Sequence, residues 1–167
     1  MNAHAGSDRE AITDALHRYC RGVDRMDRDL ILSAYHPDAV DYRGSFTGSP
    51  AALVEWMLSK DPDRVASQHC LTNVMIEVEG DTGHVESYFL ATIRRAGRSE
   101  LETFGGRYVD QVHKRGGEWR VSVRVVVMDW HSSAPALPIG PASDIGTQDR
   151  TDPSYSRPLD RFLATEG

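Results

Sequence analysis

The chain has 167 residues, of which 40% are apolar and 26% charged, and this balance fits one globular domain large enough to bury a core. Its formal net charge is −6 and it contains no run of five or six basic residues, so we expect no nucleic acid and no anionic membrane as partner, because both need a concentrated positive patch. No apolar run approaches the roughly 18 residues of a membrane span, and the N-terminus lacks the apolar core of a signal peptide.

The two cysteines, Cys20 and Cys70, form no CxxC motif, and both lie in apolar surroundings. This pattern is typical of reduced thiols in a protein core. We expect a cytoplasmic location, because disulfides persist mainly in oxidising compartments. A disulfide between the two residues stays open on the sequence alone.

The first sixty residues carry helical patterns. Residues 7–10 (Ser-Asp-Arg-Glu) form a capping-box pattern, and apolar side chains then recur every three to four residues, which predicts a first helix over about 8–23. A second short helix is predicted over 27–35, with Pro37 ending it. A third helix is predicted over 49–60, because Ser is a good cap and Pro suits the first helical turn.

After residue 60 the apolar period changes to two, which indicates strands. Turns that contain glycine separate the segments, and such a succession predicts an antiparallel meander. Paired glycines at 105 and 106 interrupt the third segment and indicate a bulge or a sharp bend. The predicted strands cover residues 73–79, 84–95, 101–113 and 118–130.

Helices followed by consecutive strands predict an α+β fold, with the helices packed on one face of the sheet. A long bent sheet surrounds a concave space, where a ligand pocket is expected. We assign Val85, Val121, Val123 and Val125 to the outer face, and an antiparallel sheet that is apolar on both faces needs cover on both. We therefore expect a homo-oligomer that packs through the sheet.

Residues 1–131 are expected to form the domain, whereas residues 132–167 contain five of the eight prolines and show no clean period. One interpretation of this irregular segment is a partly disordered C-terminal tail. The other is an arm that packs on a neighbour or over the mouth of the pocket. The side chains that could anchor such an arm are Tyr155, Leu159, Phe162 and Leu163.

Several common catalytic motifs are missing from the sequence. It contains no GxSxG, GxGxxG, GxxxxGK[ST] or HExxH motif, and its seven histidines are scattered without the spacing of metal ligands. We therefore expect neither a serine-hydrolase site nor a phosphate-binding loop. The chemistry is expected to need no cofactor and no metal.

Three residues are candidates for proton transfer. Asp24 lies at the edge of the apolar stripe of the first helix, where a partly buried acid needs a partner. His69 lies where the first long strand begins, and imidazole is well suited to accept a proton near neutral pH. Tyr19 belongs to the apolar stripe, and its buried hydroxyl needs a partner. Each also has a plain explanation: a solvated acid at a helix end, a core-edge histidine and a packed ring.

Several short segments occur in an order and spacing that resemble a known family. They are Tyr19–Asp24 (YCRGVD), Tyr35–Val40 (YHPDAV), His69 with Asn73, Gly106–Asp110 (GRYVD) and Gly117–Val121 (GEWRV). Over residues 8–131 the chain resembles the SnoaL-like branch of the nuclear-transport-factor-2-like superfamily. Within it, the chain is most similar to cofactor-independent lyases: bile-acid dehydratases, scytalone dehydratase and hexachlorocyclohexane dehydrochlorinase.

The resemblance implies a cone-shaped curved sheet around an apolar cavity, and a catalytic Asp–His pair that matches Asp24 and His69. The bile-acid dehydratases add a tyrosine five residues before the acid, which matches Tyr19. They also use an arginine on the last strand, whose nearest counterpart here is Met128, with Arg124 slightly earlier. Similar dehydratases further imply a homotrimer.

On this basis His69 is the expected general base, Asp24 fixes its tautomer and stabilises the imidazolium, and Tyr19 donates to a leaving hydroxyl or an enolate oxygen. The predicted reaction is a dehydratase-type elimination on a small apolar substrate that contains an aromatic, polycyclic or steroid-like ring system. The residues expected to contact this substrate, several of which ordinary core packing explains equally well, are Tyr42, Phe46, Trp56, Met57, Phe89, Phe104, Arg124 and Met128.

Other functions use the same fold, so the resemblance leaves alternatives. An isomerase, a cyclase or a C–C lyase would begin with the same proton removal. A non-catalytic small subunit of a ring-hydroxylating oxygenase is a second alternative. A ligand-binding module, in which Asp24 and His69 only bind a polar group, is a third.

Overall fold

The structure is a computed structural model that describes residues 3–137 and 146–159 of the chain. In chain order, the helices and strands of these residues are α1 (Ala3–Arg25), α2 (Arg28–Ser33), β1 (Tyr35–Arg43), β2 (Phe46–Gly48), α3 (Pro50–Lys60), β3 (Arg64–Glu79), β4 (Thr82–Arg95), β5 (Glu100–Arg115), β6 (Glu118–Pro135) and the short 3₁₀ helix η1 (Pro153–Tyr155).

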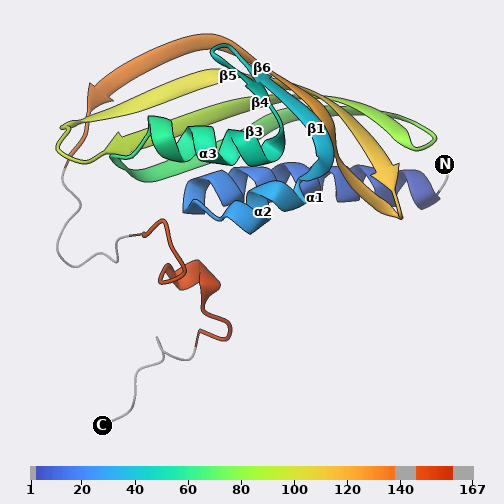
Figure 1. Cartoon of the computed structure of the whole chain (residues 1–167), viewed down its shortest axis with the longest axis horizontal. Helices are drawn as coiled ribbons and strands as arrows, with labels where there is room; N and C mark the ends of the chain where they lie inside the picture. The colour runs from blue at the N-terminus through green and yellow to red at the C-terminus, as the bar shows by residue number, and fades with distance from the viewer. Residues whose placement is uncertain (1–2, 138–145, 160–167) are drawn as a thin grey trace.

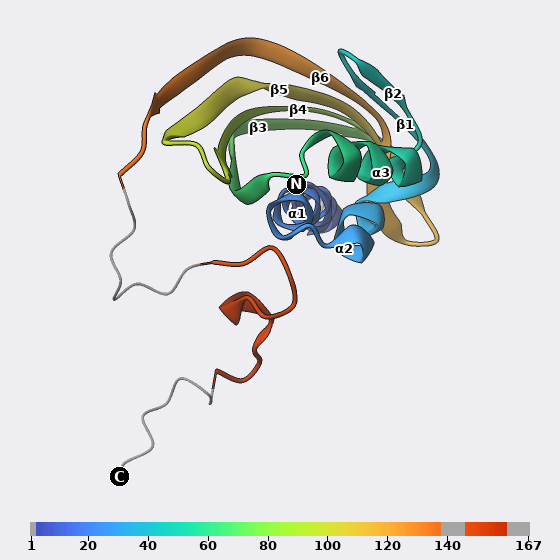
Figure 2. The same cartoon turned by 60° about the vertical axis from the view of Figure 1, so that its left-hand side comes forward.

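The strands form one six-stranded sheet with the order β2-β1-β6-β5-β4-β3. Neighbouring strands are antiparallel except β1 and β6, which run parallel. The sheet is strongly curved, its concave side faces α1, and α3 lies beside the end formed by β1 and β2 (Figure 1, Figure 2). The predicted α+β fold, a curved sheet around N-terminal helices, is therefore confirmed, and the parallel pairing of β1 is a feature that the predicted meander lacked.

Helix α1 is longer than predicted at both ends. It begins at Ala3, so the capping-box pattern at Ser7 lies inside the helix, and it continues to Arg25. Helix α3 follows the prediction, because Ser49 caps it and Pro50 occupies its first turn. The apolar stripe of α1 is almost fully buried, as its period predicts; it comprises Ile12, Leu16, Tyr19, Cys20 and Val23.

The second helix ends earlier than predicted, and a strand follows it. Helix α2 ends at Ser33, and β1 begins at Tyr35. Pro37 lies within β1, where the pairing with β6 shifts register between Tyr35 and Val40. Proline has no N–H to donate to a ladder, so it is tolerated at such an irregularity. The prediction that Pro37 ends a helix over 27–35 was therefore wrong.

A bulge in β6 changes which side chains face the core. Val121 pairs with Val112, whereas Val123 pairs with Gln111, so an extra residue separates the two valines. Because side chains alternate along a strand, this slip turns Val123 to the face opposite Val121. Val121 and Val85 are buried in the core, so their predicted place on the outer face was wrong.

The convex face of the sheet nevertheless carries exposed apolar side chains. One cross-strand row comprises Met75, Glu86, Val109, Val125 and Tyr42, and its four apolar members are 39–64% exposed. Neighbouring rows add further apolar side chains, and exposed apolar patches of this kind mark interaction surfaces. We call this surface the convex patch; it comprises Tyr42, Met75, Tyr88, Leu90, Val109 and Val125.

The paired glycines of β5 lie at the predicted bulge, because the register with β6 shifts between Gly105 and Gly106. A Cβ atom on Gly106 would lie 2.2 Å from the carbonyl oxygen of Val127. A Cβ atom on Gly105 would lie 2.2 Å from the ring of Trp130. The close approach of β5 and β6 at this bend therefore requires glycine.

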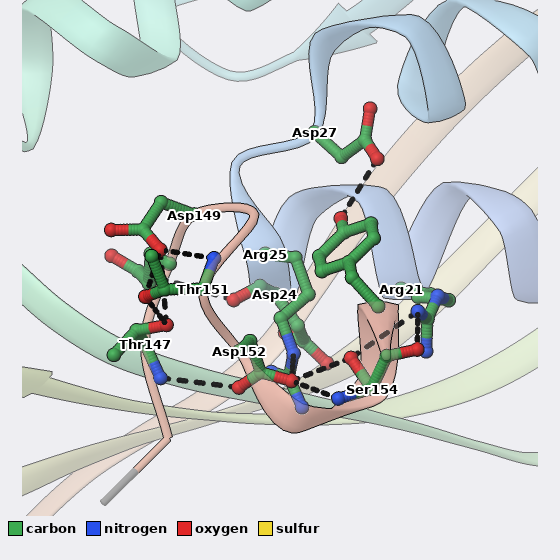
Figure 3. Close-up of polar contacts among 11 residues, drawn as sticks. Arg21, Asp24, Arg25, Asp27, Thr147, Asp149, Thr151, Asp152 and Ser154 are labelled. Atoms are coloured by element: carbon green, nitrogen blue, oxygen red, sulfur yellow. Dashed lines mark hydrogen bonds and ion pairs between the residues drawn. The ribbon is translucent and has the colours of Figure 1, made fainter. Parts of the chain in front are cut away.

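The described part of the C-terminal segment, residues 146–159, packs below α1 on the side away from the sheet (Figure 1, Figure 3). Tyr155 donates from its hydroxyl to Asp27 at 2.7 Å. Gln148 donates from its amide to the main-chain oxygen of Asp24 at 3.3 Å. Tyr155 is thus an anchor of this segment, as in the arm interpretation.

Asp152 is the most deeply buried acid of the segment and organises it. Its carboxylate contacts Nε of Arg25 at 3.3 Å and accepts hydrogen bonds from the main-chain nitrogens of Ser154 and Thr147 at 3.0 and 3.1 Å (Figure 3). Leu159 is exposed, so it does not anchor the segment as was predicted. The other two proposed anchors, Phe162 and Leu163, lie outside the described residues.

Both cysteines are free: Cys20 is buried, whereas Cys70 is exposed on the edge strand β3, so its predicted place in the core was wrong. Burial raises the pKa of the Cys20 thiol to about 12. In the described part of the chain, no helix is long and apolar enough to cross a membrane.

The first prediction concerns the docking of residues 146–159. The side chain of Ser154 and two main-chain N–H groups lower the pKa of Asp152 to about 2. An acid with a depressed pKa in the folded protein stabilises it when ionised and loses that effect on protonation. Docking should therefore hold above about pH 4 and weaken as the pH falls towards about 2.

Asp152→Asn imitates the protonated state at neutral pH and should release the segment. We expect trypsin to cleave after Arg150 several times faster than in the wild-type protein, whereas the Arg157–Pro158 bond resists trypsin in every variant. Asp149→Asn is the control, because among the described residues the carboxylate of Asp149 hydrogen-bonds only to threonines of the same segment. Equal cleavage rates for wild type and Asp152→Asn would contradict the role given to this carboxylate.

The second prediction concerns assembly. We propose that the convex patch packs against copies of the same chain, with a trimer as the expected state. Sedimentation of the wild-type protein should then give the mass of three chains. Val109→Glu and Val125→Lys each place a charge in the middle of the patch and should dissociate the assembly. A monomeric mass for the wild-type protein would refute the proposal.

Candidate active site

Asp24 lies in the last turn of α1, directly after the buried Val23. Gly22 allows α2 to pack tightly against this turn, because a Cβ atom there would lie 2.7 Å from the main-chain nitrogen of Ile31. Helix α1 also contacts β3. The end of α1 is thereby fixed between α2 and β3, and Asp24 is held next to the edge strand.

Asp24 and His69 form a hydrogen-bonded pair. Oδ1 of Asp24 lies 2.6 Å from Nδ1 of His69, and Oδ2 accepts from the main-chain nitrogen of His69 at 2.9 Å. Only 12% of the Asp24 side chain and 9% of the His69 side chain are exposed. Such a carboxylate favours the tautomer with the proton on Nδ1. Nε2, which bonds to none of the described residues, is then the basic nitrogen.

Tyr19 lies on the same helix as Asp24 and is almost fully buried. Its hydroxyl oxygen accepts a hydrogen bond from Nη2 of Arg43 at 3.0 Å. Since the oxygen serves as an acceptor there, its proton can be donated elsewhere. The Tyr19 ring packs edge-on against Tyr35 and Tyr108, which fixes its direction.

Arg43 and Asp41 are site residues that the sequence analysis missed. Nε and Nη2 of Arg43 bind the two oxygens of Asp41 at 2.6 and 2.7 Å, and Tyr35 donates to Oδ2 at 2.8 Å. Both residues belong to β1, a strand that the sequence analysis did not predict. The alternation of Val40, Asp41, Tyr42 and Arg43 was the available signal.

Arg124 was expected to contact the substrate, and its position argues otherwise. It is fully buried and binds both oxygens of Asp110 at 2.8 and 2.7 Å. Its guanidinium lies 4.3 Å from the ring centre of Tyr19 and 4.2 Å from that of Tyr108. Burial raises the pKa of Asp110, and Arg124 opposes this shift. The Arg124 guanidinium therefore packs on the Tyr19 ring and lines neither cavity described below.

A cavity of about 630 Å³ lies between the sheet, α1 and α3. His69 and Tyr19 both line it, so the base and the candidate donor face one space. Several charged side chains also line it, and those of Asp63 and Arg98 are 44% and 56% exposed. The walls of the expected apolar cavity thus combine buried apolar side chains with largely buried arginines such as Arg43 and Arg95, and further charges lie at its rim. The buried apolar walls are Val23, Met57, Phe89, Ala91 and Tyr108.

A second cavity, of about 680 Å³, lies on the other side of the pair and is lined by both Asp24 and His69. Tyr19 does not line it. The imidazole nitrogen that faces Asp24 is Nδ1, and it is already hydrogen-bonded to the carboxylate. The first cavity is therefore the one that brings His69 together with the tyrosine and the aromatic walls.

The predicted substrate contacts divide into two groups. Trp56, Met57, Phe89, Phe104 and Met128 line the first cavity. The other three, Tyr42, Phe46 and Arg124, line neither cavity. Tyr42 belongs to the convex patch, and Phe46 packs on the ring of Trp56 at a centroid distance of 5.2 Å.

The sequence profile of the SnoaL-like domain matches residues 5–125 of the chain. No curated protein gives a significant match. Three solved structures of similar fold illustrate the range of relatives. A candidate scytalone dehydratase from Novosphingobium aromaticivorans has a TM-score of 0.71 and 21% identity, over 86% of this chain and 100% of its own.

The second is the type 3 hexachlorocyclohexane dehydrochlorinase LinA from Novosphingobium barchaimii, with a TM-score of 0.70 and 19% identity over 81% of this chain and 95% of its own. The third is a candidate aromatic-ring hydroxylase from Novosphingobium aromaticivorans, with a TM-score of 0.68 and 24% identity over 77% and 94%. At this level of identity the three likenesses establish the fold, and the profile match over most of the chain establishes that the protein belongs to the SnoaL-like domain family.

Proposed function

We propose that the protein is a cofactor-independent lyase that eliminates water, or a comparable leaving group, from an apolar ring-containing substrate. The observation that carries the proposal is the contact between Asp24 Oδ1 and His69 Nδ1 at 2.6 Å, beside a cavity that His69 lines. Two of the solved relatives carry names of elimination enzymes, a dehydrochlorinase and a candidate scytalone dehydratase, which supports this choice.

The reaction begins at Nε2 of His69, which removes a proton from a substrate carbon next to an activating group. Asp24 then faces an imidazolium and stabilises its charge across the short hydrogen bond. The electrons of the broken C–H bond form the double bond, and the hydroxyl leaves from the neighbouring carbon. The removed proton and the leaving hydroxyl together make one water, so the reaction balances without another reactant.

Tyr19 donates a hydrogen bond to the leaving hydroxyl, or it stabilises the negative charge on an enolate oxygen. Arg43 donates to the phenol oxygen, and the Arg124 guanidinium stands over the ring, so positive charge lies near the oxygen from which the proton is donated. The aromatic walls, including Phe89 and Tyr108 stacked at a centroid distance of 4.5 Å, suit a flat ring system.

Other reactions that begin with the same proton removal are isomerisation, cyclisation and C–C cleavage, and they use the same pair. The likeness to a candidate ring hydroxylase keeps a non-catalytic oxygenase subunit as an alternative of another class. Co-purification with an iron–sulfur partner would favour that alternative. Tight ligand binding without turnover would favour a binding module. The two free cysteines support a reducing compartment, and we propose the cytoplasm.

The third prediction tests the pair itself. Asp24→Asn should keep the fold but lower the rate of elimination about 10²–10⁴-fold, because the amide no longer fixes the tautomer or balances the imidazolium. A suitable assay substrate is a β-hydroxy ketone fused to an aromatic ring, whose dehydration gives a conjugated enone with a stronger ultraviolet absorption. Asp29→Asn, which changes an exposed acid on α2, is the matched control.

A measurement without substrate complements this assay. Nitrogen NMR of His69 should show the proton on Nδ1 in the wild-type protein and a changed tautomer ratio in Asp24→Asn. Near-normal turnover of Asp24→Asn on a substrate that the wild-type protein converts would refute the catalytic pair.

The fourth prediction concerns Tyr19. Tyr19→Phe removes the donor while keeping the packed ring, and we expect kcat to fall about 10²-fold with a smaller change in KM. Tyr35→Phe is the control, because Tyr35 packs against Tyr19 and donates to Asp41 but does not line the cavity. Its kcat should stay within a few-fold of wild type. Equal losses in the two variants would assign Tyr19 a packing role only.

A further inference from the structure

Five cationic side chains line the first cavity, the one that both His69 and Tyr19 line. Three of them have carboxylate partners in the protein. Arg43 binds Asp41 through two hydrogen bonds, and Arg95 binds Asp61 and Glu102. The exposed Arg98 lies 4.0 Å from Glu102. The other two are Lys60 and Arg64.

Arg64 has no carboxylate within 4 Å among the described residues. Its Nη2 contacts the sulfur of Met26, which is a weak acceptor, and its buried Nε has no hydrogen-bond partner. Burial lowers the pKa of the Arg64 guanidinium, and the charge of Asp24 only partly opposes this shift. A buried cation without a bound counter-charge is costly, so an anion that reaches Arg64 gains a strong interaction.

Arg64 is placed to act on the same ligand as His69. It is the first residue of β3, five residues before His69, and both side chains line one cavity. The register of β3 with β4 shifts between Arg64 and Ala66, next to Arg64. Lys60 lies at the rim, where its Nζ is 3.2 Å from the hydroxyl of Ser45 and 4.5 Å from the ring centre of Trp56.

We propose that Arg64 binds a carboxylate of the substrate, so that the natural substrate is a ring-containing organic acid. A partly buried guanidinium with no ion-pair partner among the described residues can balance one negative charge, which a carboxylate supplies. Its planar fork also matches the two carboxylate oxygens. The proposal rests on the proposed function for the location of the substrate, and it adds the charge that this substrate carries and the residue that selects it.

The test uses two isosteric probes, 2-naphthoate and its neutral amide 2-naphthamide, each titrated calorimetrically into the wild-type protein. The wild-type protein should bind the naphthoate more tightly than the amide. Arg64→Gln should weaken naphthoate binding by about tenfold or more, as expected for the loss of a charge-assisted hydrogen bond. Binding of the amide should stay within about twofold. Arg64→Lys, which keeps the charge, should restore part of the preference.

Arg98→Gln is the matched control, because it removes an exposed cation from the same cavity and should change neither affinity by more than about twofold. Three outcomes would overturn the proposal: an unchanged naphthoate affinity in Arg64→Gln, equal losses for both probes, or a wild-type protein that binds the amide as tightly as the acid. Equal losses would mean that Arg64 only shapes the cavity or positions Asp24.

The same titrations on His69→Gln separate this proposal from the proposed function. Naphthoate binding and its dependence on Arg64 do not require the base, so they should persist in this variant. A protein that selects the acid through Arg64 but never turns over a substrate would refute the lyase and keep the anion site. A protein whose turnover depends on Asp24 and His69, but whose naphthoate affinity does not depend on Arg64, would support the lyase and refute the anion site.

Discussion

Both oxygens of the Asp24 carboxylate bind the same residue, one through the imidazole Nδ1 of His69 and the other through its main-chain nitrogen. A carboxylate held by two donors cannot turn without losing a charge-assisted bond, so the imidazole keeps one direction relative to α1. The same two bonds join the last turn of α1 to β3, which is an edge strand with β4 as its sheet neighbour. The position of the last turn of α1 beside β3 and the proposed chemistry therefore share one side chain.

The tyrosine of the site depends on charges that are buried behind it. Arg43 and Asp41 form one pair, and Arg124 and Asp110 form another, so the charges cancel locally. Pairing is what makes burial of such groups tolerable. The first pair holds the Tyr19 oxygen and the second supports its ring. Arg64 belongs to neither pair. Arg43 and Arg124 are thus bound by carboxylates of the protein, whereas Arg64 is the cation proposed to bind the ligand.

The local patterns predicted much of this molecule because they are set by nearest neighbours. The buried stripe of α1, the cap at Ser49 and the bend at Gly105 follow from period, capping and glycine geometry. Bulges and parallel pairing depend on distant residues and could not be read in this way. The extra residue after Val121 turned Arg124 into the core, and the irregular pairing of β1 with β6 hid Arg43. The pairing of Asp24 with His69 is long-range, and it was reached through the resemblance to known lyases, since either residue alone has a plain structural explanation.

The C-terminal segment supports the site from the side opposite the cavity. Asp152 binds Arg25, the neighbour of Asp24 (Figure 3). Gln148 binds the main-chain oxygen of Asp24, while His69 holds its carboxylate. An acid–base pair works best when its groups need no rearrangement during the reaction. Because residues 146–159 bind the main chain of Asp24 and none of them lines the first cavity, they can influence the rate through geometry alone. Residues 146–159 in this sense help to keep the Asp24–His69 pair in place.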